Sequence, residues 1–204
     1  MIPSMIPTTL PELNDLLGGG FPNTGLSLIT GAPMTGKTML VVNLLPKLLA
    51  SPKVSAAIIS EDLLNFWETR LRRERDRQGI DGLPGTRSYC TDDTTVVDIR
   101  LCDIIVVDGL LRKQALNKTL QEYARKSPLI VTVGVPAREV SLFASVILHL
   151  ERFGEVTTCT VVKNREGPQG GSCTFCLNEA QCVIEVPQVE ILSKWVRLLG
   201  EDII

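Results

Sequence analysis

The spacing of apolar and polar positions along the chain predicts strands that alternate with helices. Strands are expected at residues 25–30, 54–60, 102–109, 129–135 and 146–152, and helices at 38–50, 62–77, 114–126 and 139–145. The run CDIIVVDG is almost unbroken in its apolar character, as is typical of a strand that helices cover on both faces. The alternation therefore predicts a doubly wound α/β fold with a mainly parallel sheet.

The two ends of the chain differ from this central pattern. Residues 1–24 are rich in proline and glycine and predict an arm around a short helix at 12–17. Three alternating runs after Arg152, at 156–164, 172–178 and 182–186, predict a C-terminal antiparallel extension, and an amphipathic helix is expected at 189–199. We therefore expect an N-terminal arm, 1–24, followed by one domain, 25–204.

Composition narrows the location and the class of the protein. The chain has 204 residues, 44% of them apolar, and a formal net charge of −2, which excludes a uniformly basic surface. No window contains the ~18 consecutive apolar residues that a membrane span needs, and the first ten residues do not resemble a signal peptide. We expect a cytoplasmic protein, or a nuclear one in a eukaryote, whose six cysteines are reduced thiols.

A phosphate-binding loop is predicted where the first strand meets the first long helix. The residues Gly31, Ala32, Pro33, Met34, Thr35, Gly36, Lys37 and Thr38 satisfy the pattern G-x-x-x-x-G-K-[ST]. Backbone amides of such a loop surround a β-phosphate, the lysine neutralises β and γ oxygens, and the hydroxyl ligates Mg²⁺. The position between strand and helix predicts a site for ATP and Mg²⁺.

Carboxylates at strand ends supply the remaining groups for hydrolysis. Asp108 ends an apolar run and is expected on a neighbouring strand as the second Mg²⁺ ligand, although an Asp-Gly turn alone would explain it. Glu61 ends the second strand, which we expect beside the first, and is the candidate base that orients water. The adjacent Asp62 is the alternative base or a helix cap.

Three segments, LPELNDLLGGGFPNTGLSLITGAPMTGKT, IISEDLLNFWETRL and VVKNREGPQGGSCTF, together resemble the RecA-like P-loop ATPase core. The resemblance is strongest to the ATPase domain of DnaB-like and RepA-like hexameric helicases, with KaiC and RadA proteins as neighbours. It implies a homo-oligomer, a hexameric ring or a filament, that acts on single-stranded DNA with replication or recombination proteins. In that family the glutamate at the position of Glu61 is the catalytic base.

The same resemblance implies a role for two basic residues near the C-terminus. In these helicases the lysine and arginine of the K-N-R segment reach the γ-phosphate of the neighbouring subunit, so Lys163 and Arg165 are the residues carried over. The alternative is a basic hairpin tip with Gly167 and Pro168 as turn formers.

Two departures from the family concern the coupling of ATP to DNA. Gly134 stands where a γ-phosphate sensor, Gln or His, is usual, and the loop that follows it is short. DNA contacts in this family come from loops after two core strands, and the candidates there are Arg112, Lys113 and Arg138, with ordinary solvated charges as the alternative. The arginine-rich run 70–77 is better explained as a solvated helix face with internal ion pairs.

The first functional hypothesis is therefore a Mg²⁺-dependent ATPase motor, a minimal hexameric DNA helicase or translocase core. The alternative is a recombinase paralogue or helicase loader with weak ATPase activity, which Gly134 and the short loop favour. A metabolic kinase is disfavoured because no lid or acceptor motif is present. Zinc binding by Cys173 and Cys176 is also disfavoured, because residues three apart in a strand point to opposite faces.

Overall fold

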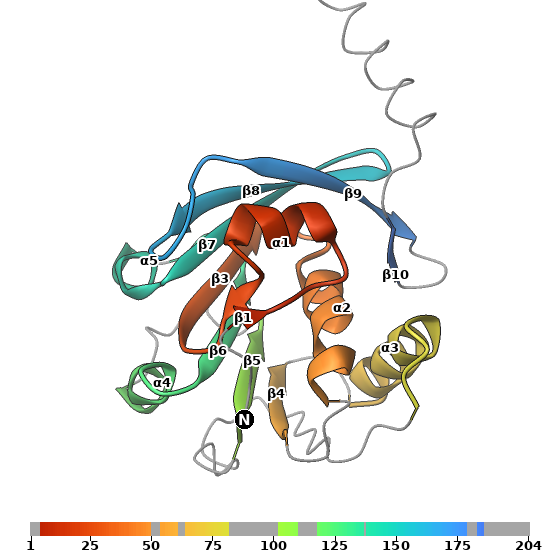
Figure 1. The fold of residues 1–204 in the computed structure, drawn as a ribbon, viewed down its shortest axis with the longest axis horizontal. Helices are drawn as coiled ribbons and strands as arrows, with labels where there is room; N and C mark the ends of the chain where they lie inside the picture. The colour runs from red at the N-terminus through yellow and green to blue at the C-terminus, as the bar shows by residue number, and fades with distance from the viewer. Residues whose placement is uncertain are drawn as a thin grey trace, which may run out of the picture.

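The computed structural model describes residues 5–49, 54–60, 64–81, 102–109, 118–136, 138–178 and 183–185. Its centre is an eight-stranded sheet with the order β10-β9-β8-β7-β3-β6-β5-β4 (Figure 1). The five central strands are β3 (Gly25–Gly31), β4 (Ala56–Ser60), β5 (Ile104–Asp108), β6 (Pro128–Val133) and β7 (Val146–Phe153). All four pairings among them are parallel, which confirms the predicted doubly wound core.

The predicted antiparallel extension is also confirmed. Strands β8 (Val156–Asn164), β9 (Ser172–Asn178) and β10 (Val183–Glu185) continue the sheet beyond β7, each antiparallel to its neighbour. The register of β7 and β8 shifts between Ile147 and Leu148, so that Val162 on β8 has no partner in the ladder. Such a bulge bends a strand locally.

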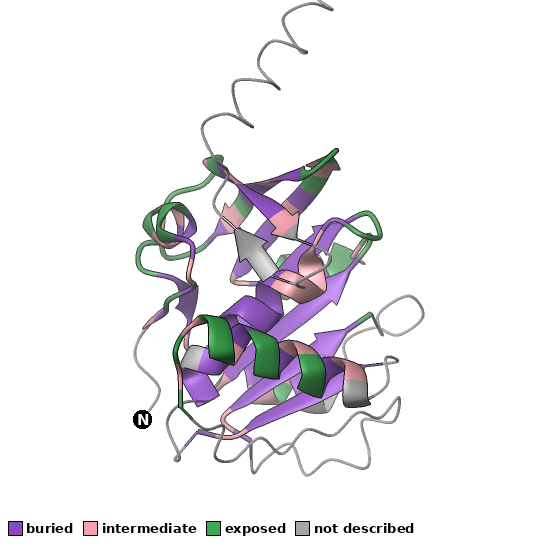
Figure 2. Cartoon of the chain, turned by 90° about the vertical axis from the view of Figure 1, so that its right-hand side faces the viewer, coloured by how far each residue is buried: buried purple, intermediate pink, exposed green. Residues whose placement is uncertain are grey.

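Helices cover both faces of the sheet. Helix α2 (Lys37–Leu49), which continues through Pro46, packs on one face, and α3 (Leu64–Arg77) packs outside α2 with its polar side exposed (Figure 2). Helices α4 (Lys118–Ala124) and α5 (Arg138–Phe143) contribute Leu120, Ala124 and Val140 to the opposite face. The expected helix at 189–199 lies outside the described residues. No described helix is long and apolar enough to cross a lipid bilayer.

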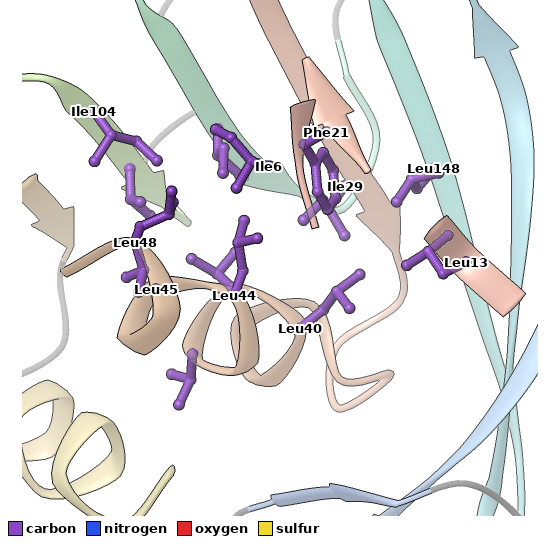
Figure 3. Packing of buried hydrophobic residues seen from close by; sticks show 14 of the residues in the cluster. Ile6, Leu13, Phe21, Ile29, Leu40, Leu44, Leu45, Leu48, Ile104 and Leu148 are labelled. Atoms are coloured by element: carbon purple, nitrogen blue, oxygen red, sulfur yellow. The ribbon is translucent and has the colours of Figure 1, made fainter. Parts of the chain in front are cut away.

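The N-terminal arm forms part of the hydrophobic core. Strands β1 (Met5–Ile6) and β2 (Phe21–Pro22) pair with each other, and α1 (Pro11–Leu17) lies between them in sequence. Ile6, Leu13 and Phe21 belong to the same buried cluster as Ile29 of β3 and the apolar side of α2 (Figure 3). The apolar side chains of the arm therefore cover sheet and helix surface that water would otherwise reach.

One expectation about strand order was wrong. The second core strand, β4, is not beside β3 but at the edge of the sheet, and β5 and β6 lie between the two. Asp108 is likewise not on a strand adjacent to β3, because β6 separates β5 from β3. The apolar pattern shows only that a strand is buried on both faces, and all the central strands share that property. Their lateral order depends on which helix crosses which face.

Candidate functional site

The phosphate loop occupies the turn between β3 and α2, as the sequence predicts. Gly31 and Gly36 adopt φ angles of +143° and +96°, which favour glycine. A Cβ at Gly31 would lie 2.3 Å from the carbonyl oxygen of Leu150, and one at Gly36 would lie 2.8 Å from the side chain of Leu177. Gly31 is therefore required by close backbone packing as well as by its conformation, whereas Gly36 is required mainly by its conformation, because the Leu177 side chain can shift.

The Lys37 ammonium is held inside this loop by carbonyl groups. Its Nζ donates to the carbonyl oxygens of Gly31 at 2.9 Å and of Ala32 at 2.6 Å. Burial lowers the pKa of Lys37, and the nearby carboxylate of Asp108 opposes that shift. A phosphate ligand would have to draw the ammonium away from these two carbonyls, and a doubly charged phosphate is the stronger partner for it.

Thr38, Asp108 and Thr132 form a polar group directly behind the loop, in which Asp108 and Thr132 are buried and Thr38 is half-buried. The Thr38 hydroxyl lies 2.9 and 3.1 Å from the two carboxylate oxygens of Asp108. Thr132, on the strand between them, donates its hydroxyl to the same carboxylate. Asp108 is nearly buried, so its orientation is fixed by these two contacts. The role of Thr132 was missed in the sequence, where the only signal was a polar residue within an apolar strand.

This donor set fits a magnesium ion. A hydroxyl and a carboxylate are the hard oxygen ligands that Mg²⁺ prefers, and P-loop enzymes hold the ion with an equivalent pair. Thr38 is the second residue of α2, and Asp108 is the last residue of β5. The pair therefore lies at the carboxyl edge of the sheet beside the loop. Ligands of doubly wound folds bind at this edge.

Strands β7, β8 and β9 support the loop from the other side. The Thr157 hydroxyl donates to the carbonyl of Thr35 at 3.3 Å, and Arg152 Nη1 donates to the carbonyl of Met34 at 3.2 Å. Leu177 of β9 packs against Gly36. These supporting residues could not be predicted from the sequence, because they come from strands that follow the loop by more than 110 positions.

The described residues around β4 end at Ser60, immediately before the candidate base. Glu61 and Asp62 lie outside them, as do Arg112 and Lys113. Ser60, the residue before Glu61, is paired in register with Asp108 at the end of β5. Nearer to the loop, at the end of β6, the carbonyl of Gly134 accepts a hydrogen bond of 3.3 Å from the amide of Gly31. At the expected sensor position, therefore, a backbone group contacts the loop.

Lys163 and Arg165 lie far from the phosphate loop of their own chain. Lys163 Nζ donates to the carbonyls of Ser141 and Leu142 at 2.9 and 3.1 Å, and Arg165 Nη2 donates to that of Leu142 at 2.7 Å. These carbonyls belong to the last turn of α5, where cations are favoured. Partial burial and the charge of Arg165 lower the pKa of Lys163.

The strand registers show how large this separation is. The amide of Arg165 bonds to Ser145, whose own amide bonds to Leu26, so Arg165 is level with a residue five positions before Gly31. At about 3.3 Å per residue that offset is about 16 Å along the strands, and β7 also lies between β3 and β8. An arginine side chain does not span that distance, so Arg165 does not serve its own loop in this structure.

The cysteines, the arginine-rich run of α3 and Arg138 are the remaining residues that the sequence singled out. Cys159 and Cys173 face each other across β8 and β9 within the core, and their mutual hydrogen bond, together with burial, raises the pKa of Cys159. Among the described residues no group of three or more potential ligands is arranged to hold a metal ion. Arg75 and Arg77 pair with Asp76 and Glu74, as an ion-paired helix face requires. Arg138 is exposed at the first position of α5.

The strand order, the helices on both faces and the loop between β3 and α2 define a RecA-like α/β domain. Among solved structures the chain is similar to the crystal structure of the RadB recombinase, with a TM-score of 0.71 and 21% identity over 90% of this chain and 100% of that chain. No protein-family model and no curated protein matches the sequence. The similarity to RadB confirms the expected RecA-like fold, while the narrower resemblance to DnaB-like helicases stays a hypothesis.

Proposed function

We propose that this protein is a Mg²⁺-dependent ATPase that assembles with copies of itself and acts on DNA in recombination. The observation that carries the proposal is the contact of Thr38 with Asp108 directly behind a phosphate loop whose lysine is poised at 2.6–2.9 Å from loop carbonyls. Nothing in a purely structural strand–helix turn requires a lysine, a hydroxyl and a buried carboxylate to converge there.

The chain's own residues account for binding and for activation of water. Backbone amides of the loop, other than that of Pro33, and the amino end of α2 would face the phosphates. Lys37 would exchange its two carbonyl partners for phosphate oxygens. Thr38 and Asp108 would hold the ion, and Thr132 keeps the carboxylate oriented. A bound Mg²⁺ would neutralise charge on the β and γ oxygens. Glu61, which follows Ser60 in the sequence, would accept a proton from the attacking water.

Lys163 and Arg165 are proposed to complete the site of a neighbouring copy. They are too distant to reach their own loop, and within the described part of the chain their side chains donate to the last carbonyls of α5. Delivered to another subunit's γ-phosphate, two cations would stabilise the charge that develops during phosphoryl transfer. Hydrolysis would then depend on assembly. If they are instead a basic hairpin tip, their removal should not alter turnover.

The similarity to RadB favours a recombinase paralogue as the cellular role. The backbone contact at Gly134, in place of a side-chain sensor, and the short loop after β6 agree with slow hydrolysis that serves assembly rather than movement along DNA. The K-N-R-E-G-P segment favours a second candidate, a hexameric helicase or translocase core that acts on single-stranded DNA. In either role Arg112, Lys113 and Arg138 are the proposed DNA contacts.

One experiment separates these roles. ATP turnover is measured across a range of protein concentrations, with and without single-stranded DNA, and strand separation is followed on a forked duplex. A paralogue should show turnover that rises with protein concentration and no strand separation, whereas a helicase should be stimulated by DNA and separate the strands. Absence of Mg²⁺-dependent ATP binding would refute both.

A further inference from the structure

Two cysteines in the core are direct partners across neighbouring strands. The described part of the chain contains four cysteines with free thiols, Cys102, Cys159, Cys173 and Cys176. Of these, Cys159 of β8 pairs in register with Cys173 of β9, and the two thiols share a hydrogen bond. Both side chains belong to the buried cluster on the side of the strands that α1 covers (Figure 1). The proposed ATPase site uses neither thiol of this pair.

The strand register places the two cysteines at a separation that a disulfide can bridge. The amide of Val161 donates to the carbonyl of Gly171 at 2.9 Å, and an antiparallel ladder repeats every two residues. Cys159 and Cys173 therefore occupy a hydrogen-bonded position of the ladder, where the Cα atoms of opposite residues are about 5.5 Å apart. Disulfides form across Cα separations of about 4.4–6.8 Å.

A disulfide at this position would draw the two strands together locally. The Cβ atoms of directly opposite residues in an antiparallel pair are about 4.5–5.5 Å apart. A disulfide holds its Cβ atoms about 3.5–4.5 Å apart. The bond would therefore be strained, and strained disulfides are the readily reduced ones. This geometry favours a reversible bond over a permanent one.

The two thiols differ in access and in acidity. Cys173 is 6% exposed, whereas Cys159 is fully buried. Their mutual hydrogen bond lowers the pKa of Cys173, although burial and the charge of Glu12 oppose that shift, and the same bond raises the pKa of Cys159. Because the thiolate is the form that reacts with oxidants, Cys173 is the residue that reacts first and Cys159 is its partner.

The pair lies on the same strand faces as two supports of the phosphate loop. Thr157 is two residues before Cys159, and its hydroxyl donates to a carbonyl of the loop at 3.3 Å. Leu177 is four residues after Cys173, and its side chain lies against Gly36. Side chains an even number of residues apart point to the same face of a strand. A local movement of β9 towards β8 therefore acts on both supports.

We propose that Cys159 and Cys173 form a reversible disulfide when the protein meets a peroxide, and that this bond weakens nucleotide binding by shifting Thr157 and Leu177 against the phosphate loop. The effect on the nucleotide rests on the proposed function, because it requires that the loop binds ATP. The disulfide itself rests only on the pairing of the two strands.

The chemistry balances with one peroxide for each disulfide. The Cys173 thiolate attacks one oxygen of hydrogen peroxide and the O–O bond breaks, which leaves a sulfenic acid and a hydroxide that takes up the proton released by the thiol. The Cys159 sulfur then attacks the Cys173 sulfur, the S–O bond breaks, and the Cys159 proton leaves with the hydroxyl group as water. Two thiols are thus oxidised by two electrons, and the peroxide is reduced to two waters.

Oxidation of the full chain, followed by mapping of its disulfides, tests the proposal. The reduced protein is treated with hydrogen peroxide, blocked with N-ethylmaleimide and digested for mass spectrometry. Affinity for a fluorescent ATP analogue with Mg²⁺ is measured before oxidation, after it, and after addition of dithiothreitol. We expect a link between Cys159 and Cys173 and about tenfold weaker binding, which corresponds to the loss of about one hydrogen bond.

The return of affinity distinguishes the disulfide from a second effect of peroxide. Met34 of the loop is 75% exposed and is open to oxidation to the sulfoxide. Dithiothreitol reduces the disulfide but leaves a methionine sulfoxide unchanged, because that group needs a dedicated reductase. Affinity should therefore return with dithiothreitol to the value of the untreated protein.

Three variants assign the two steps to their residues. Cys159→Ala should form no link and should keep a sulfenic acid at Cys173 that dimedone traps, whereas Cys173→Ala should give no trapped group at Cys159. Cys176→Ala, on the opposite face of β9, is the matched control and should oxidise as the parent does. Binding of the ATP analogue by each reduced variant reports that it is folded.

Absence of the link between Cys159 and Cys173 would overturn the proposal, as would a mapped link that leaves the affinity unchanged. Loss of affinity by oxidised Cys159→Ala to the same extent as the parent would also overturn it, because the disulfide would then not be the cause. A reduced parent that binds no nucleotide would refute the proposed ATPase and the effect on the loop, and mapping of the link would still decide whether the disulfide forms.

Discussion

Thr38 and Asp108 are 70 residues apart in the sequence, and the hydroxyl of the first lies 2.9 Å from the carboxylate of the second. The helix that begins after β3 and the end of β5 bring them together, and Thr132 of the intervening β6 fixes the carboxylate from behind. The Thr132 side chain on β6 thus orients Asp108, the proposed metal ligand at the end of β5.

Removing the charge of Asp108 should weaken metal use more than nucleotide binding. Asp108→Asn keeps the size of the side chain and its contact with Thr38, but it loses the carboxylate that holds Mg²⁺. We expect the Mg²⁺ concentration that gives half-maximal turnover to rise by about tenfold or more, in line with one lost charged ligand. Titrating Mg²⁺ at saturating ATP measures this change. An unchanged requirement would show that Asp108 is only a turn residue.

Glu61→Gln should retain ATP binding and lose turnover, because the amide cannot accept the proton of the attacking water. The loss expected of a general base is about 10²–10⁴-fold. Single-turnover hydrolysis measures it, and equilibrium binding of a fluorescent ATP analogue is the companion measurement. Asp62→Asn is the matched control. If Asp62→Asn rather than Glu61→Gln abolishes turnover, the base has been assigned to the wrong neighbour.

Arg165→Ala should bind ATP almost normally and hydrolyse it poorly, since an arginine supplied in trans is worth about 10³-fold or more in rate. Lys37→Ala should fail to bind nucleotide, because it removes the charge that faces the phosphates. An equimolar mixture of the two variants should recover part of the turnover, as mixed neighbours rebuild intact sites. Turnover by the mixture is compared with that of each component at the same total concentration. Co-assembly without any recovery would assign Arg165 a structural role.

Replacing Arg112, Lys113 and Arg138 together by alanine should reduce the affinity for single-stranded DNA and flatten its dependence on salt, because phosphate contacts release counterions. Fluorescence anisotropy of a labelled oligonucleotide at several salt concentrations measures both quantities. Arg72 and Arg73, exposed on α3, provide a control pair whose replacement should change neither. Unchanged affinity in the triple variant would place the DNA contact elsewhere.

A buried carboxylate ties α3 to α2 and contributes to stability. Glu74 is 1% exposed and accepts hydrogen bonds from Asn43, Arg77 and Gln78. Glu74→Ala removes the acceptor shared by the buried Asn43 amide and the partly exposed side chains of Arg77 and Gln78, so we expect a loss of about 1–3 kcal/mol in the free energy of unfolding. Urea denaturation measures the loss. Glu68→Ala, exposed on the same helix, should change the free energy by no more than about 0.5 kcal/mol.

Much of the fold could be predicted because the apolar pattern is local. Strands β8 and β9 begin and end at the expected residues, and the buried run before Asp108 forms β5, since strand burial leaves a direct record in the order of apolar residues. The turn between β3 and α2 was predictable for a related reason, because the glycines, lysine and threonine of the proposed phosphate loop lie within eight successive residues.

Other features required the tertiary structure, because they depend on contacts between segments far apart in the chain. The edge position of β4 reflects the route of its crossover, and Thr132 acts only because β6 lies between the loop and Asp108. The sequence determined the chemistry of the loop and the kind of sheet that carries it. Tertiary structure decided that Lys163 and Arg165 lie too far from their own loop to serve it, because β7 separates β8 from β3 and the register sets them toward the opposite end of the sheet.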